Sequence, residues 1–204
     1  MQSRWVLVGG IVAALALLWL VFWPEPSVTN YPSDGETIVA FGDSLVYGYG
    51  ATDGNDFVSV VERSVGEPII NLGVNGDTTR DGLVRLDDAL AKNPKVVILL
   101  LGGNDALQKI PEAETFANLA TMIERIHASG SMVLLLGVRG GLLTDSFAHE
   151  YRMLAAEYHT AFVPDVLDGV FGRPALMADP IHPNDAGYAI IAERVAKELV
   201  PLLE

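Results

Sequence analysis

Short apolar runs alternate with amphipathic segments along most of the chain. The run at residues 95–101 is apolar almost throughout, which is typical of a strand buried on both faces of a parallel sheet. Four further short runs predict strands at residues 37–41, 68–71, 132–137 and 161–164. Segments with helical periodicity lie between and after them, at residues 56–65, 79–90, 111–129, 145–159 and 184–203.

This alternation of strands and helices predicts an α/β domain with a parallel sheet and helices on both faces. The predicted helix ends agree with it. Asp77 and Thr78 precede one helix and are good N-cap residues, and Pro111 stands in the first turn of another. Ligand sites in such sheets lie beyond the carboxyl ends of the strands. We therefore expect the residues that carry chemistry in the connections at that edge.

The N-terminus has a different pattern. Residues 5–23 contain no charged side chain, and as a helix they would span roughly 28 Å, close to the apolar thickness of a bilayer. Trp5, Trp19 and Trp23 stand near the ends of this run, where interfacial aromatic residues are enriched. We predict a transmembrane anchor at residues 1–23, a linker rich in Pro, Ser, Asn and Asp at residues 24–35, and a folded domain at residues 36–204.

A cleaved signal peptide and a buried core helix are alternatives to this anchor. The run is longer than the apolar part of a signal peptide, and its one Ala-x-Ala triplet lies mid-run, at residues 14–16. Arg4 precedes the run and Glu25 follows it, so the positive-inside rule places the domain on the extracytoplasmic, periplasmic side. Cleavage would instead give a secreted protein.

Charge and cysteine content exclude several classes of function. The formal net charge is −13 and no cluster of Lys and Arg is present, so a nucleic-acid partner is not expected. The same charge would repel anionic lipid headgroups, so any membrane contact must come from apolar insertion. The chain has no cysteine, which excludes disulfides, thiol catalysis and cysteine-ligated zinc.

Four polar blocks stand where the chain reaches the carboxyl edge of the predicted sheet. They are Gly42-Asp43-Ser44-Leu45, Asn75-Gly76-Asp77-Thr78, Gly102-Gly103-Asn104-Asp105 and Asp179-Pro180-Ile181-His182-Pro183-Asn184. Each block alone is also compatible with an ordinary turn or helix cap. Together they supply what acyl transfer needs: a nucleophile, a base, a group that orients the base, and donors for an oxyanion. We assign these roles to Ser44, His182 and Asp179, with the backbone N–H groups of Ser44 and Gly76 and the Asn104 amide as donors.

The order of the four blocks resembles the SGNH (GDSL-like) hydrolases, whose letters denote blocks matched here by Ser44, Gly76, Asn104 and His182. The spacing is most similar to the bacterial arylesterase and thioesterase/lysophospholipase branch, over roughly residues 37–203. The resemblance implies a three-layer α/β/α sandwich with a five-stranded, flavodoxin-like parallel sheet. It also implies a Ser-His-Asp mechanism on acyl esters, lysophospholipids or thioesters, with no metal or organic cofactor.

Other polar groups receive less specific interpretations. Residues 137–143 follow the fourth strand and are placed to line an acyl groove, so we interpret Arg139 and Leu142 as substrate-binding residues. Asp43 and Asp105 are interpreted as residues that shape their turns. The remaining histidines lie in helical segments without the short spacing of a zinc site, at positions His127, His149 and His159.

Three other functions compete with acyl-ester hydrolysis. The first is O-deacetylation of envelope glycans, which the resemblance also allows. The second is a tethered binding protein, which would require a damaged set of blocks, and all four are intact. The third is a metal-dependent phosphoesterase that uses Asp43, Asp105 and His182.

Overall fold

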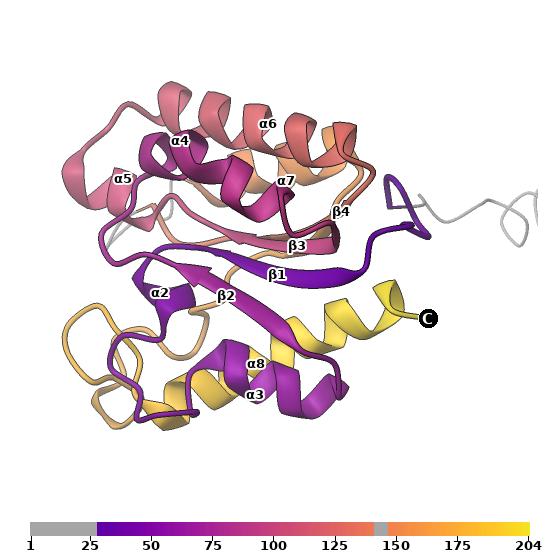
Figure 1. Cartoon of the computed structure of the whole chain (residues 1–204). Coiled ribbons are helices and arrows are strands. Elements are labelled where there is room, and N and C mark those ends of the chain that lie inside the picture. The colour runs from indigo at the N-terminus through magenta and orange to yellow at the C-terminus, as the bar shows by residue number, and fades with distance from the viewer. Residues whose placement is uncertain (1–27, 141–146) are drawn as a thin grey trace, which may run out of the picture.

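The computed structural model describes residues 28–140 and 147–204. Five parallel strands form one sheet in the order β2-β1-β3-β4-β5 (Figure 1). The strands are β1 (Thr37–Gly42), β2 (Ile69–Gly73), β3 (Pro94–Leu100), β4 (Met132–Leu136) and β5 (Ala161–Val163). This is the flavodoxin-like order of a doubly wound sheet. The predicted five-stranded parallel sheet is confirmed, with strand ends close to those expected from the apolar runs.

Helices cover both faces of the sheet, which confirms the predicted three-layer sandwich. Helices α4 (Thr79–Leu90), α6 (Glu112–Ala128) and α7 (Ala148–Tyr158) lie on one face, and α3 (Phe57–Val65) and α8 (Asp185–Leu199) lie on the other (Figure 1). Shorter helices that the sequence did not predict complete the fold: α2 (Ser44–Tyr47), α5 (Gly103–Gln108) and the 3-10 turns η1 (Pro174–Leu176) and η2 (Val200–Leu202).

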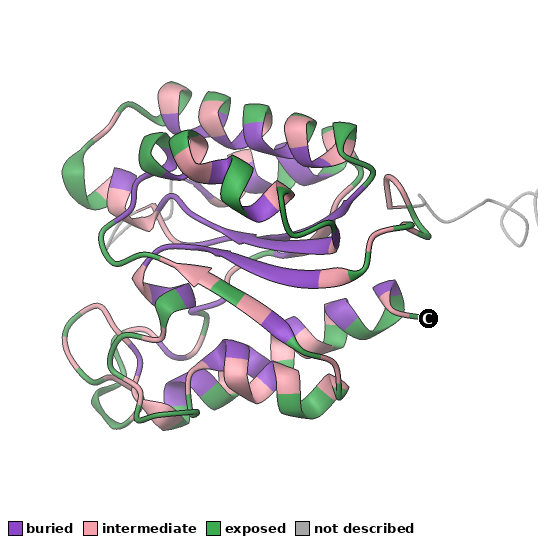
Figure 2. Ribbon diagram, in the orientation of Figure 1, coloured by how far each residue is buried: buried purple, intermediate pink, exposed green. Residues whose placement is uncertain are grey.

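The core lies between the sheet and its two helical layers (Figure 2). Strands β1 and β3 are buried along almost their whole length, because central strands of a parallel sheet are covered on both faces. Helices α4 and α8 start within one residue of their predicted positions. Thr78 forms a capping box with Asp81 at the start of α4, and Asn184 Oδ1 accepts the N–H groups of Ala186 and Gly187 at the start of α8.

Residues 28–35, the described part of the expected linker, are bound to the domain. The Thr29 N–H donates to the His159 carbonyl at 2.9 Å, and Asn30 Nδ2 donates to the carbonyls of His127 and Ser131 at 2.9 and 3.0 Å. Contacts with the domain therefore begin before the expected domain start at Glu36. The predicted anchor at residues 1–23 lies outside the described residues. Within residues 28–140 and 147–204, no helix has both the length and the apolar character needed to span a bilayer.

Candidate active site

Ser44 lies at the carboxyl end of β1, where the strand turns directly into α2. A close approach between strands requires Gly42 here, because a Cβ atom on this residue would lie 2.1 Å from the Leu100 carbonyl oxygen of β3. Asp43 then caps α2, since its Oδ1 accepts the Leu45 N–H at 2.9 Å. The Ser44 N–H belongs to the first turn of α2, where backbone N–H groups have no acceptor within the helix.

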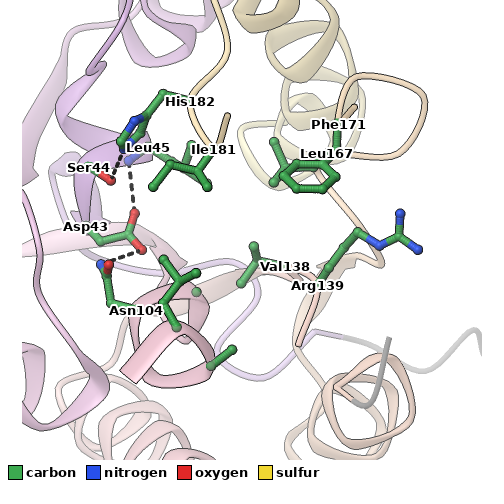
Figure 3. Close-up of a pocket in the computed structure, with 13 residues that line it drawn as sticks. Asp43, Ser44, Leu45, Asn104, Val138, Arg139, Leu167, Phe171, Ile181 and His182 are labelled. Carbon is green, nitrogen blue, oxygen red and sulfur yellow. Dashed lines mark hydrogen bonds between the residues drawn. The ribbon is translucent and has the colours of Figure 1, made fainter. Parts of the chain in front are cut away.

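His182 stands on the loop that precedes α8 and faces Ser44. Its Nε2 lies 3.0 Å from Ser44 Oγ (Figure 3). Its Nδ1 lies 2.7 Å from Asp179 Oδ2. The other carboxylate oxygen of Asp179 accepts the backbone N–H groups of Ile181 and His182, both at 2.8 Å. The structure therefore joins the three predicted residues in one series of hydrogen bonds.

The electrostatics of this loop keep Asp179 ionised. Burial acts to raise the pKa of Asp179, but the hydrogen bonds from the His182 ring and from two backbone N–H groups outweigh it and hold the pKa below its ordinary value. A carboxylate at this position accepts a hydrogen bond from Nδ1–H, so that Nε2 is the ring nitrogen without a proton. That tautomer can accept the hydroxyl proton of Ser44, as general-base activation of a nucleophile requires.

The two other predicted donors differ in where they lie. Asn104, on α5, lines the same cavity as Ser44, and its Nδ2 donates to Asp43 Oδ2 at 3.5 Å (Figure 3). It also donates to the Asp77 carbonyl at 2.9 Å. Gly76 has a φ of +87°, so its place in the turn after β2 favours glycine. It is not among the residues that line the cavity.

The cavity beside Ser44 has a volume of about 260 Å³, with polar groups at one end and apolar walls beyond them. Sequence reasoning did not find most of these walls, which come from α2, from α5, from the segment after β4 and from the connections on either side of η1. They are Leu45, Ala106, Leu107, Val138, Leu167, Phe171 and Ile181. Such an arrangement can hold a hydrocarbon chain with its ester group against Ser44.

Arg139, which we interpreted as a substrate-binding residue, also lines this cavity, but its guanidinium points away from Ser44 (Figure 3). Its Nε lies 3.9 Å from Asp165 Oδ2. The aliphatic part of Arg139 is therefore the part beside Val138 and the apolar walls. The other predicted substrate-binding residue, Leu142, lies outside the described residues.

Comparison with known proteins identifies the family. Residues 40–190 match the GDSL-like Lipase/Acylhydrolase family. Esterase TesA of Pseudomonas aeruginosa is 34% identical over 180 residues, which cover 82% of this chain and 90% of the esterase. Thioesterase 1/protease 1/lysophospholipase L1 of Escherichia coli (strain K12) is 29% identical over 177 residues, covering 82% and 85% of the two chains.

A solved structure agrees with these sequence matches. The crystal structure of TesA matches with a TM-score of 0.77 at 34% identity, covering 82% of this chain and 99% of that one. The chain belongs to the GDSL-like lipase/acylhydrolase family. The predicted family is thereby confirmed, and this GDSL-like protein is a carboxylic ester hydrolase, in agreement with the esterase and thioesterase/lysophospholipase names of its relatives.

Asp43 and Asp105 were both interpreted as turn-shaping residues, but in this GDSL-like hydrolase only Asp43 lines the cavity. Asp105 is fully buried, and it accepts the N–H and hydroxyl of Thr79 and the hydroxyl of Thr115, so it ties α5 to α4 and α6. It does not line the cavity, which argues against a metal site built from Asp43, Asp105 and His182. Asp43 does line the cavity, in addition to capping α2.

Arg85, on α4, does not line the cavity, but it makes contacts near the site that the sequence did not indicate. Its guanidinium donates to Asp77 Oδ2 at 2.5 Å and to the carbonyls of Leu72 and Gly42 at 2.9 and 2.8 Å. These bonds join the ends of β1 and β2 to the turn that contains Gly76. Nothing in the amphipathic pattern of α4 distinguishes this arginine from an exposed one.

Burial of Asp43 predicts a specific dependence of stability on pH. Burial raises the pKa of Asp43 from 3.8 to about 7; the Leu45 N–H opposes this rise, and the charges of Asp77 and Asp105 add to it. The folded state therefore binds this proton more tightly than the unfolded state. The resulting stability is complete below pH ~4 and is lost as the pH rises to about 7.

Thermal unfolding followed by circular dichroism measures this effect. Between pH ~4 and ~7 the Tm of the wild type should fall relative to that of Asp43→Asn, which keeps an acceptor for Leu45 but cannot ionise. Asp88→Asn, at an exposed position on α4, is the control and should follow the wild type. If Tm changed with pH in the same way for the wild type and for Asp43→Asn, a raised pKa of Asp43 in the folded protein would be contradicted.

Proposed function

We propose that the protein hydrolyses acyl esters through a Ser44-His182-Asp179 triad. The observation that carries this proposal is the series of hydrogen bonds from Ser44 Oγ to Nε2 of His182 at 3.0 Å and from Nδ1 to Asp179 at 2.7 Å. Ser44 Oγ attacks the carbonyl carbon while His182 takes the hydroxyl proton. His182 then gives that proton to the leaving alcohol. A water molecule, which gives a proton to His182 in the same way, then attacks the acyl-enzyme. The acid is released, and His182 returns the proton to Ser44 Oγ.

The substrate carbonyl oxygen becomes negatively charged in the tetrahedral intermediate, so hydrogen-bond donors are needed near Ser44. The N–H of Ser44 is suited to this because it lies in the first turn of α2, and the Asn104 amide because it lines the same cavity. For Asn104 to serve, one of its N–H groups must turn from its present acceptors toward the substrate. The resemblance to SGNH hydrolases, rather than the cavity lining, supports the Gly76 N–H as a third donor.

The apolar walls of the cavity favour an acyl chain rather than an acetyl group alone. We propose acyl esters, lysophospholipids or thioesters as substrates, in line with the relative named thioesterase and lysophospholipase. O-Deacetylation of envelope glycans is the alternative. An acetyl group has one methyl group beyond the carbonyl carbon, so O-deacetylation would use little of the apolar cavity.

Substitution of Ser44 tests the mechanism. Ser44→Ala should lower kcat on p-nitrophenyl butyrate and octanoate by at least ~10⁴-fold, and Asn104→Ala should lower it by about 10²–10³-fold. Chelator is present throughout, so that a contaminating metalloenzyme does not contribute. Ser64→Ala, at an exposed position on α3, is a matched serine control and should keep wild-type activity. Hydrolysis that survives Ser44→Ala would refute the serine mechanism.

The chain-length profile tests the substrate class. Leu167 is 5% exposed and lines the cavity, so Leu167→Trp should fill apolar space beyond the ester. We expect kcat/KM for p-nitrophenyl octanoate to fall on the order of tenfold, with the acetate ester changed less than about twofold. Val84→Trp, at an exposed site on α4, is the control. A wild type that cleaves acetate alone would favour the deacetylase instead.

We also propose that residues 5–23 anchor the domain in a membrane, with the domain on the extracytoplasmic side. The support is the uncharged sequence of this run and the position of Arg4 before it. Full-length protein should stay in the membrane pellet after carbonate washing. Recovery in the supernatant, with a mass that lacks the N-terminal residues, would instead indicate a cleaved signal and a secreted enzyme.

A further inference from the structure

Arg85 is a largely buried cation on α4, beside the site. Its side chain is 19% exposed, and that of its partner Asp77 is 11% exposed. The guanidinium lies over the Phe41 ring of β1, with its central carbon 4.1 Å from the ring centroid. A charge in such surroundings needs well-placed partners, so the contacts of this guanidinium constrain the residues around it.

Three acceptors hold the guanidinium, and they come from different segments at the carboxyl edge of the sheet. Its Nε donates to Asp77 Oδ2, in the turn after β2. Its two other nitrogens donate to the Leu72 carbonyl near the end of β2 and to the Gly42 carbonyl at the end of β1. Gly42 lies two residues before Ser44. Arg85 therefore joins the strand end that leads to Ser44 with the turn after β2.

The turn after β2 continues this connection to Asn104. The Asp77 carbonyl accepts a hydrogen bond from Asn104 Nδ2 at 2.9 Å, whereas the other acceptor of that amide, Asp43 Oδ2, lies at 3.5 Å. The bond to Asp77 is therefore the stronger of the two, and it fixes the direction in which the amide group faces. The second N–H of Asn104 has the more distant acceptor, so it is the one that can turn toward a substrate. Arg85 thus holds the residue that orients Asn104.

We propose that Arg85 is a positioning residue for the oxyanion site, which it orients through Asp77 and the Asn104 amide. This inference rests on the proposed serine mechanism, with Asn104 as a donor. Neither Arg85 nor Asp77 lines the cavity, so neither would touch the substrate. A displaced turn would move the Asn104 amide from the place where the oxyanion forms, while the apolar walls that bind the acyl chain would stay in place. Loss of the Arg85 contacts should therefore lower kcat more than it raises KM.

Arg85→Lys tests this proposal, because lysine keeps the positive charge but lacks the planar group that binds three acceptors. With full-length enzyme in detergent and p-nitrophenyl butyrate, Arg85→Lys should lower kcat on the order of 10- to 100-fold and change KM less than about threefold. That fall is no larger than the one expected for Asn104→Ala. Arg125→Lys is the matched control and should keep the wild-type kcat. Arg125 also donates to a carboxylate and a carbonyl of α4, those of Asp87 and Leu83, but it does not line the cavity.

A double-mutant cycle with Asn104 separates positioning from a general structural role. If Arg85 acts through Asn104, Arg85→Lys should lower kcat less than about threefold in the Asn104→Ala background. Asp77→Asn removes the charged acceptor of Arg85 but keeps the Asp77 carbonyl, so it should give a smaller fall with the same dependence on Asn104. Circular dichroism shows whether each variant is folded at the assay temperature, and Asp77→Asn decides the question if Arg85→Lys does not fold.

Two results would overturn the proposal. An equal fall in kcat with and without the Asn104 side chain would mean that Arg85 supports the fold in general. An unchanged kcat in Arg85→Lys would mean that the oxyanion site does not depend on this guanidinium. Either result, with rates that still depend on Ser44 and Asn104, refutes the role of Arg85 alone. Rates that survive Ser44→Ala refute the proposed function, and a kcat that Asn104→Ala does not lower refutes Asn104 as a donor; the inference then fails with them.

Discussion

The hydrogen bond between Asp179 and Nδ1 of His182, at 2.7 Å, is the interaction on which the site depends. It selects the tautomer that can accept a proton from Ser44, and it forms only while the loop between η1 and α8 is folded back on itself. Two backbone N–H groups of that loop bind the same carboxylate, and the Ala178 N–H donates to the His182 carbonyl at 2.8 Å. The loop thus supplies its own support for the His182 ring.

The parallel sheet brings this loop opposite Ser44. Ser44, Asn104 and Val138 follow β1, β3 and β4, whose carboxyl ends share one edge. Close packing at that edge depends on glycine. A Cβ atom on Gly42 would meet the Leu100 carbonyl, and one on Gly102 would lie 2.3 Å from the Tyr151 hydroxyl. The sandwich therefore positions the reactive groups through backbone contacts, while the cavity walls set the space for substrate.

Much of this arrangement follows from the sequence, because apolar runs and caps define the strands and helices, and the four polar blocks carry Ser44, Asn104, Asp179 and His182. Helices α2 and α5 were missed because 4 and 6 residues are too short to show an amphipathic period. The cavity walls Leu167 and Phe171 lie in a segment without periodicity, so only the folded chain places them. The contact between Arg85 and the Gly42 carbonyl likewise joins residues far apart in sequence.

Covalent labelling of the nucleophile tests the central claim most directly. A fluorophosphonate ester reacts with a serine only where a base and an oxyanion site activate it. Mass spectrometry of the labelled full-length protein should find one adduct, on the peptide that contains Ser44, and His182→Ala should prevent its formation. Absence of an adduct on the wild type, an adduct on another residue, or undiminished labelling of His182→Ala would contradict the account of Ser44 as a nucleophile activated by His182.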